Sequence, residues 1–93
     1  MQISIKESES KGAVTAIDAG QIAGEMTYSR AGEHHIIIDH TEVDPAFKGK
    51  GVGKQLLYKL VEMARAKDIK ITPLCPFANA MFQKLTDIQD VLK

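Results

Sequence analysis

Residues 36–57 of this chain read IIIDHTEVDPAFKGKGVGKQLL. Three consecutive isoleucines indicate a strand that is covered on both faces, so we expect the strand over about 34–43 to lie in the centre of its sheet. The glycine-rich loop after it leads into a helix, because apolar residues recur three and four positions apart from Val52 to about Lys67. Strand, loop and helix together predict the first half of a crossover unit.

The flanking segments extend this unit into a sheet. Before it, apolar and polar residues alternate over three stretches, 3–5, 13–17 and 22–28. Short polar turns separate these stretches, which predicts an antiparallel meander. Residues 69–72 predict a short strand after the helix, and a right-handed crossover would place it parallel to strand 34–43. A second short helix begins at Pro76, a residue suited to the first helical position.

The expected fold is therefore mixed α/β, of the α+β class. It contains an antiparallel meander, a central strand, a crossover helix, a parallel strand and a short C-terminal helix. At 93 residues, the whole chain, 1–93, is expected to form a single domain. An open strand edge permits self-association without requiring it, so we expect a monomer or a weak homodimer.

The composition excludes several classes of function. Lys plus Arg is 12 and Asp plus Glu is 12, so the formal net charge is zero and neither nucleic acid nor anionic membrane is an expected partner. No apolar run approaches the roughly 20 residues that span a bilayer. The first residues lack the basic and apolar parts of a secretion signal, so we expect a complete, cytoplasmic protein. Its single cysteine, Cys75, is then a free thiol.

Polar residues follow Ile38 at the carboxyl end of the central strand, where ligand crevices usually open. A period of two places Ile36, Ile38, His40 and Glu42 on one face. His40 and Glu42 are therefore candidate bases, with a surface histidine and a solvated carboxylate as the plain alternatives. No metal site is predicted, because the histidines have no cysteine or second cluster at ligand spacing.

The loop Lys48-Gly49-Lys50-Gly51-Val52-Gly53-Lys54 favours an anion. Its glycines let backbone amides approach a ligand, and the helix start adds free N–H groups and the positive end of the helix dipole. A solvated turn is the alternative. The NTPase phosphate loop does not fit, because Lys48 stands where its first glycine is required. The dinucleotide fingerprint does not fit either, because Lys54 or Leu56 stands where its third glycine is required.

The stretch 43–57 resembles the acetyl-CoA loop of the GNAT N-acetyltransferase superfamily, Arg/Gln-x-x-Gly-x-Gly/Ala. Gly51 and Gly53 match its last two fixed positions, whereas Lys48 stands where Arg or Gln is usual. Residues 71–77, ITPLCPF, are similar to small single-domain members of the superfamily, the YjdJ-type proteins. The resemblance implies an N-acetyltransferase with acetyl-CoA as co-substrate, no metal, and an amine acceptor that the sequence does not identify.

The resemblance also implies which residues hold acetyl-CoA. Amides of the glycine loop would bind the pyrophosphate, and a backbone N–H near Val43 would polarise the thioester carbonyl. Asn79 could hydrogen-bond pantetheine, although an exposed helix asparagine is the stronger default. The predicted cofactor-binding residues are Val43, Lys48, Gly49, Lys50, Gly51, Val52, Gly53, Lys54 and Asn79.

Acetyl transfer also needs a base for the amine and an acid for the departing thiolate. Members of the superfamily often use a tyrosine of the last helix as the acid, but this chain has Phe77 and Phe82 there. Cys75 lies near the helix N-cap, where the dipole favours a thiolate, although buried inert thiols are commoner. We therefore predict that Cys75 either protonates the CoA thiolate or carries the acyl group. The predicted catalytic residues are Cys75, His40 and Glu42.

Three functions remain open on the sequence. The first is N-acetyl transfer. The second is a CoA- or acyl-CoA-binding module without turnover, favoured because the chain lacks the extra helices and strands that build the acceptor site in longer members. The third is a protein-interaction domain in which the glycine loop is only a turn.

Overall fold

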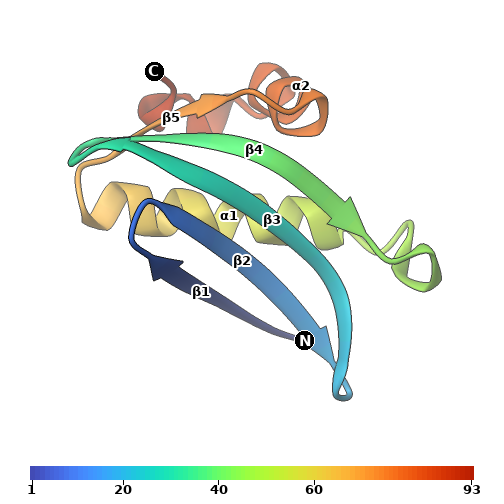
Figure 1. The fold of residues 1–93 in the computed structure, drawn as a ribbon. Helices are drawn as coiled ribbons and strands as arrows, with labels where there is room; N and C mark the ends of the chain where they lie inside the picture. The colour runs from blue at the N-terminus through green and yellow to red at the C-terminus, as the bar shows by residue number, and fades with distance from the viewer.

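Five strands pair in the order in which they occur in the chain, β1-β2-β3-β4-β5 (Figure 1). The computed structural model describes residues 1–93. The strands are β1 (Gln2–Ser8), β2 (Lys11–Asp18), β3 (Gln21–Gly32), β4 (His35–Val43) and β5 (Lys70–Pro73). The helical elements are the 3-10 turn η1 (Pro45–Phe47), helix α1 (Val52–Ala66), helix α2 (Pro76–Lys84) and the 3-10 segment η2 (Thr86–Val91).

The pairing directions follow the prediction. β1 to β4 form an antiparallel meander, and β5 returns parallel to β4 after the crossover helix α1. β4 has β3 on one side and β5 on the other, so it is an interior strand, although β3 and not β4 is the central strand of the sheet. The β2–β3 turn consists of Ala19 and Gly20, both with positive φ, which matches the right-handed twist of a two-residue hairpin.

The core lies between α1 and one face of the sheet, called the inner face below. The buried residues of α1 recur at helical spacing and are Val52, Gly53, Leu56, Leu57, Leu60, Val61 and Ala64. They form a single apolar cluster with the inner-face residues of the strands, such as Val14, Met26 and Ile36. Phe82 of α2 and Ile88 of η2 belong to the same cluster, so all the helical segments cover the inner face.

The opposite face of the sheet, called the outer face, carries no helix. Ile36 and Ile38 on the inner face are 0% exposed, whereas Ile37 on the outer face is only half-buried. The expectation that this strand is covered on both faces is therefore wrong. The apolar run reflects burial of two isoleucines beneath α1, while the third lies among neighbouring outer-face side chains.

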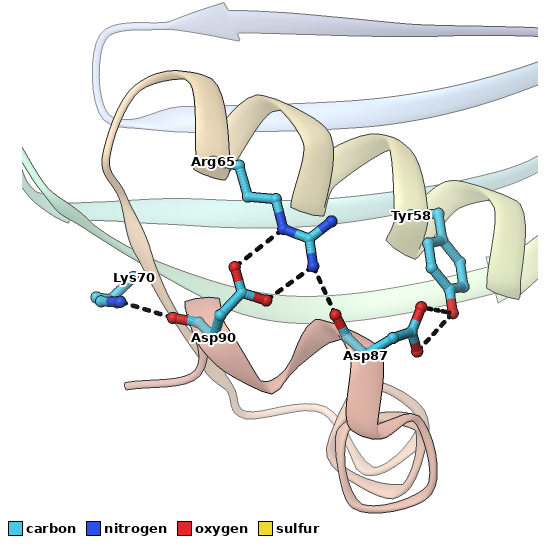
Figure 2. Close-up of polar contacts among 5 residues, drawn as sticks. All are labelled: Tyr58, Arg65, Lys70, Asp87 and Asp90. Carbon is cyan, nitrogen blue, oxygen red and sulfur yellow. Dashed lines mark hydrogen bonds and ion pairs between the residues drawn. The ribbon is translucent and has the colours of Figure 1, made fainter.

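The C-terminal segment is fastened to α1 by polar contacts (Figure 2). Arg65 donates to both carboxylate oxygens of Asp90, at 3.0 and 2.7 Å, and to the carbonyl oxygen of Asp87 at 2.6 Å. Tyr58 donates to the Asp87 carboxylate at 2.8 Å. Beyond η2, the Lys93 amide donates to the carbonyl of Ile71 at 2.9 Å, so the end of the chain covers the free edge of β5.

None of the helices is both long enough and apolar enough to cross a lipid bilayer.

Candidate active site

A β-bulge in β4 reverses the direction of its side chains. β3 and β4 pair as Tyr28 with Ile38 and next as Thr27 with His40, so Asp39 is an extra residue in β4. A one-residue insertion shifts every following side chain to the other face. Ile38 therefore faces the core, and His40 faces outward.

The bulge corrects one prediction from the sequence. Ile36 and Ile38 do not share a face with His40 and Glu42, because counting in steps of two takes no account of an inserted residue. Past the bulge, Thr41 and Val43 are the inner-face residues. Val43 pairs with Gly24, and a β-carbon on Gly24 would lie 2.9 Å from Val52 of α1.

His40 and Glu42 lie together on the outer face. The His40 Nε2 and Glu42 Oε1 atoms are 3.6 Å apart, and the two side chains are 68% and 75% exposed. Glu42 also lies directly opposite Glu25 of β3. These side chains are open to any molecule that approaches from the outer side of the sheet.

Cys75 lies on the inner side of β4. It is the N-cap of α2, as predicted, and its Sγ accepts a hydrogen bond from the Ala78 amide at 3.4 Å. The Thr41 Oγ1 atom is 3.3 Å from the same sulfur, and Cys75 is 6% exposed. Thr41 was not predicted as a site residue, because without the bulge its side chain would face outward. The structure thus separates the predicted catalytic residues: His40 and Glu42 are on one side of β4, and Cys75 is on the other.

The backbone pairing between β4 and β5 stops just before Cys75. The pairing of the two strands ends at Ile38 and Pro73, and the amides of Leu74 and Cys75 both donate to the Ile38 carbonyl at 3.1 Å. β4 runs on to Val43 with only β3 as a neighbour.

The directions of the backbone amides along this free edge of β4 follow from its hydrogen bonding with β3. The Asp44 amide donates to the Ala23 carbonyl at 2.9 Å, which marks these two residues as a hydrogen-bonded pair. Because such pairs alternate along an antiparallel ladder, the amides of Thr41 and Val43 point away from β3, on the side of β4 that has no strand partner past Ile38.

The glycine loop supplies a second set of free amides. The first hydrogen bond of α1 runs from the Gln55 amide to the Gly51 carbonyl at 3.0 Å, so the amides of Val52, Gly53 and Lys54 have no acceptor in the chain. Gly51, the N-cap, has φ +71° and gives no side-chain cap. The first turn of α1 contains no acidic residue.

The other loop residues hold this helix start in place. Phe47 is buried against the core, and the Lys50 ammonium lies 5.5 Å from the centre of its ring. Gly49 has φ +80° and open space around its α-carbon. Lys48, Lys50 and Lys54 make no ion pair, so their charges are free to add to the potential of the helix start.

Gly53 and Asn79 are engaged within the chain. A β-carbon on Gly53 would lie 2.5 Å from the Phe77 ring, so packing against α2 requires a glycine there. The Asn79 carbonyl oxygen accepts from Gln83 at 2.6 Å, and its amide nitrogen lies 3.5 Å from the Pro73 carbonyl. The contact between Gly53 and Phe77 gives no signal in the sequence.

No group of three or more His, Cys, Asp or Glu side chains is arranged to hold a metal ion.

The sequence profile described as GCN5-related N-acetyl-transferase matches residues 13–91. The chain belongs to this family. The GNAT family and fold predicted from the sequence are confirmed, and N-acetyl transfer, an acyltransferase activity, is the activity of the family. The YjdJ-type subgroup stays a prediction.

Solved structures agree with this assignment. A GCN5-like protein from Staphylococcus aureus is 39% identical, with a TM-score of 0.72 over 97% of this chain and 87% of that protein. The ribosomal-protein-alanine N-acetyltransferase of Brucella melitensis is 18% identical and shares the fold, with a TM-score of 0.71 over 84% of this chain and 62% of that enzyme. An aminoglycoside N-acetyltransferase in complex with CoA is 16% identical, with a TM-score of 0.62 over 83% of this chain and 67% of that enzyme. No curated protein matches the sequence.

Proposed function

We propose that this chain binds acetyl-CoA and transfers the acetyl group to an amine. The observation that carries the proposal is the presence of two sets of free backbone amides, one at the start of α1 and one on β4 beside Cys75. The aminoglycoside enzyme of the same fold holds CoA, which supports the choice of ligand.

The start of α1 suits the pyrophosphate. Three successive amides without acceptors, together with the positive end of a 15-residue helix, favour a doubly charged anion. Lys48, Lys50 and Lys54 add positive charge from the same loop. Lys48 supplies a point charge at the position where the family pattern has the planar guanidinium of Arg or the side-chain amide of Gln.

The free edge of β4 suits the pantetheine arm. An extended chain that carries amide groups can pair with the amides of Thr41 and Val43, as a peptide adds a strand to a sheet edge. In this arrangement the Val43 amide donates to the thioester oxygen and stabilises the negative charge that develops on it. Cys75 then lies close to the thioester sulfur.

The chemistry divides between the two sides of β4. His40 or Glu42 removes a proton from the ammonium group on the outer side. The neutral amine nitrogen then attacks the thioester carbon, the C–N bond forms, and the C–S bond breaks with its electron pair on sulfur. The nitrogen then gives its second proton to water, and the CoA thiolate takes a proton from Cys75, which is reprotonated from water.

The covalent route uses the same residues. In this route the Cys75 thiolate attacks the thioester carbon, acetyl-Cys75 forms, and CoA leaves as a thiolate that takes a proton from water. His40 or Glu42 removes a proton from the ammonium group, and the amine nitrogen attacks the carbonyl carbon of acetyl-Cys75. The C–S bond breaks with its electron pair on the Cys75 sulfur, and the nitrogen gives its second proton to water.

The second candidate function is a CoA- or acyl-CoA-binding module without turnover. The observation in its favour is the uncovered outer face, which gives an acceptor no enclosing wall.

Calorimetric binding and CoA release with a panel of primary amines distinguish the two functions. We expect acetyl-CoA to bind the wild type, to bind at least about tenfold more weakly when Lys48, Lys50 and Lys54 are changed to Glu, and to release CoA only when an amine is present. The double variant His40→Gln/Glu42→Gln should keep binding and lose about 100-fold or more in the rate of release. Binding without release for any amine indicates the binding module, and absence of binding contradicts both functions.

Intact-mass analysis after incubation with acetyl-CoA decides the role of Cys75. An acetyl adduct that is absent from Cys75→Ala indicates the covalent route. Amine-dependent turnover without any adduct indicates direct transfer.

A further inference from the structure

The outer face holds a hollow of about 720 Å³ over β1, β2 and β3, which reaches Asp39 in the bulge of β4. The residues that line it include Lys6 and Lys11, which form its β1–β2 end, and Ala13 and Thr27, which form its floor. We call it the outer trough. Figure 1 shows that no helix lies over β1, β2 or β3 on this side of the sheet.

The sheet register connects the outer trough to the proposed bases. Lys6 pairs with Ala13, Ala13 pairs with Thr27, and Thr27 pairs with His40, so these four residues form one row across four strands. The two middle residues, Ala13 and Thr27, have small side chains, so the protein surface is hollowed in the middle of the row. Because neighbouring strands lie about 4.8 Å apart, the α-carbons of Lys6 and His40 are about 14 Å apart.

The two ends of the hollow carry opposite charges. At the β1–β2 end, Lys6 makes no ion pair. Lys11 donates to the Ser29 hydroxyl at 3.0 Å, and that hydroxyl donates to the Asp39 carboxylate, so one hydroxyl links Lys11 to Asp39. Glu7 does not neutralise Lys6, because its carboxylate pairs with Arg30 at 2.9 Å and accepts from Tyr28 at 2.8 Å. Lys6 is therefore the positive charge at this end that no carboxylate neutralises.

The β3–β4 end is negative. Asp39 lines the hollow there, and beyond it Glu25 lies directly opposite Glu42. Like charges in direct register on an exposed face are unfavourable unless a cation lies between or above them. An ammonium group on this side of β4 removes that repulsion.

We propose that the acceptor of the acetyl transfer is an amine that also carries an anionic group, and that it binds lengthwise in the outer trough. This inference rests on the proposed function, because it assigns the acceptor of that reaction. The anionic group pairs with Lys6 and Lys11, and the ammonium group lies at the β4 end, where His40 and Glu42 accept its proton. The positive end of the trough repels a polycation of the same length.

The first test compares acceptors of matched length with the full chain and acetyl-CoA. We expect kcat/KM for 6-aminohexanoate to exceed that for hexylamine and for 1,6-diaminohexane by about tenfold, the size expected of two exposed ion pairs. In Lys6→Gln/Lys11→Gln this preference should fall to less than about twofold, and 0.5 M salt should reduce it in the wild type. Lys59→Gln, which removes an exposed lysine of α1 on the other side of the sheet, is the matched control and should keep the preference. A preference that survives in Lys6→Gln/Lys11→Gln overturns the proposal.

The second test does not depend on turnover. In a ¹⁵N–¹H NMR titration with 6-aminohexanoate, we expect the amide signals of Lys6, Ala13 and Thr27 to shift, and hexylamine to shift them less. Signals that stay fixed, or that shift only on other elements, overturn the assignment of the trough. If these signals shift but no amine releases CoA, the proposed acetyl transfer fails and the binding site in the outer trough stands. If amines release CoA without these shifts, the acetyl transfer stands and the assignment of the outer trough fails.

Discussion

Phe77, at the start of α2, packs directly against Gly53 in the first turn of α1. A β-carbon on Gly53 would lie 2.5 Å from Cζ of the phenylalanine ring, closer than real side chains approach. The contact fixes the helix that begins at the glycine loop against the helix that begins at Cys75. The last glycine of the motif therefore has a packing role, whatever ligand the loop binds.

This contact predicts that Gly53→Ala destabilises the protein. Overpacking costs about 1–3 kcal/mol, and the helix propensity of alanine offsets up to about 1 kcal/mol of that. Urea unfolding of the variant measures the difference. In a Phe77→Ala background the same change should be neutral or stabilising, and an equal cost in both backgrounds would show that the ring is not the cause.

Tyr28 predicts a loss of stability at alkaline pH. Burial of its ring and its hydrogen bond to Glu7 raise the pKa of Tyr28 to about 12. Because the pKa is higher in the folded state than in the unfolded state, where it is about 10, the stabilisation is complete below pH 10 and is lost as the pH rises toward 12. Two units correspond to about 3 kcal/mol. Unfolding measured between pH 8 and 12 should decline more steeply in the wild type than in Tyr28→Phe, and parallel curves would contradict this.

Arg65→Gln should loosen the end of the chain without unfolding the domain. Arg65 holds Asp90 and the Asp87 carbonyl (Figure 2). The Lys93 amide depends on this segment for its bond to Ile71. We expect faster amide hydrogen exchange at Ile88 and Lys93, with unchanged protection in β2 and β3. Lys59→Gln, which removes another exposed cation of α1, is the control. Equal protection at Ile88 and Lys93 in Arg65→Gln and the wild type would show that the ion pair does not hold η2.

Thr41→Val should change the reactivity of the only thiol in the chain. The Thr41 hydroxyl lies 3.3 Å from the Cys75 sulfur, and a hydrogen bond from it stabilises the thiolate. We expect alkylation by iodoacetamide at pH 7 to be about fivefold slower in Thr41→Val, whereas Thr41→Ser should restore most of the rate. Because Cys75 is the single cysteine, mass analysis reads its modification alone. Equal rates in Thr41→Val and the wild type would mean that the hydroxyl has no influence on the sulfur.

Local patterns predicted the fold correctly where local forces determine it. The alternation in β1 to β3, the helical spacing of α1 and the handedness of the crossover were sufficient to predict the meander and the parallel β5. Pro76 also correctly indicated the start of α2, and with it the N-cap position of Cys75.

Features that depend on tertiary register were not predictable. The bulge at Asp39 arises from pairing with β3, and it moved His40 and Glu42 away from the face that the count of two assigned to them. The same shift brought Thr41 to Cys75. The pattern of Ile36–Ile38 indicated burial but could not show that helices cover only one face.

The proposed site depends on the free main-chain amides of Val52, Gly53 and Lys54 at the start of α1, which hold the pyrophosphate of CoA. The most direct measurement is a ¹⁵N–¹H NMR titration of the full chain with CoA, with adenosine as the ligand that lacks the pyrophosphate. We expect CoA, and not adenosine, to give the largest shifts at Gly51, Val52, Gly53 and Lys54, with a second group of shifts at Thr41 and Val43. Saturation by CoA that leaves the signals of 49–54 in place would contradict it.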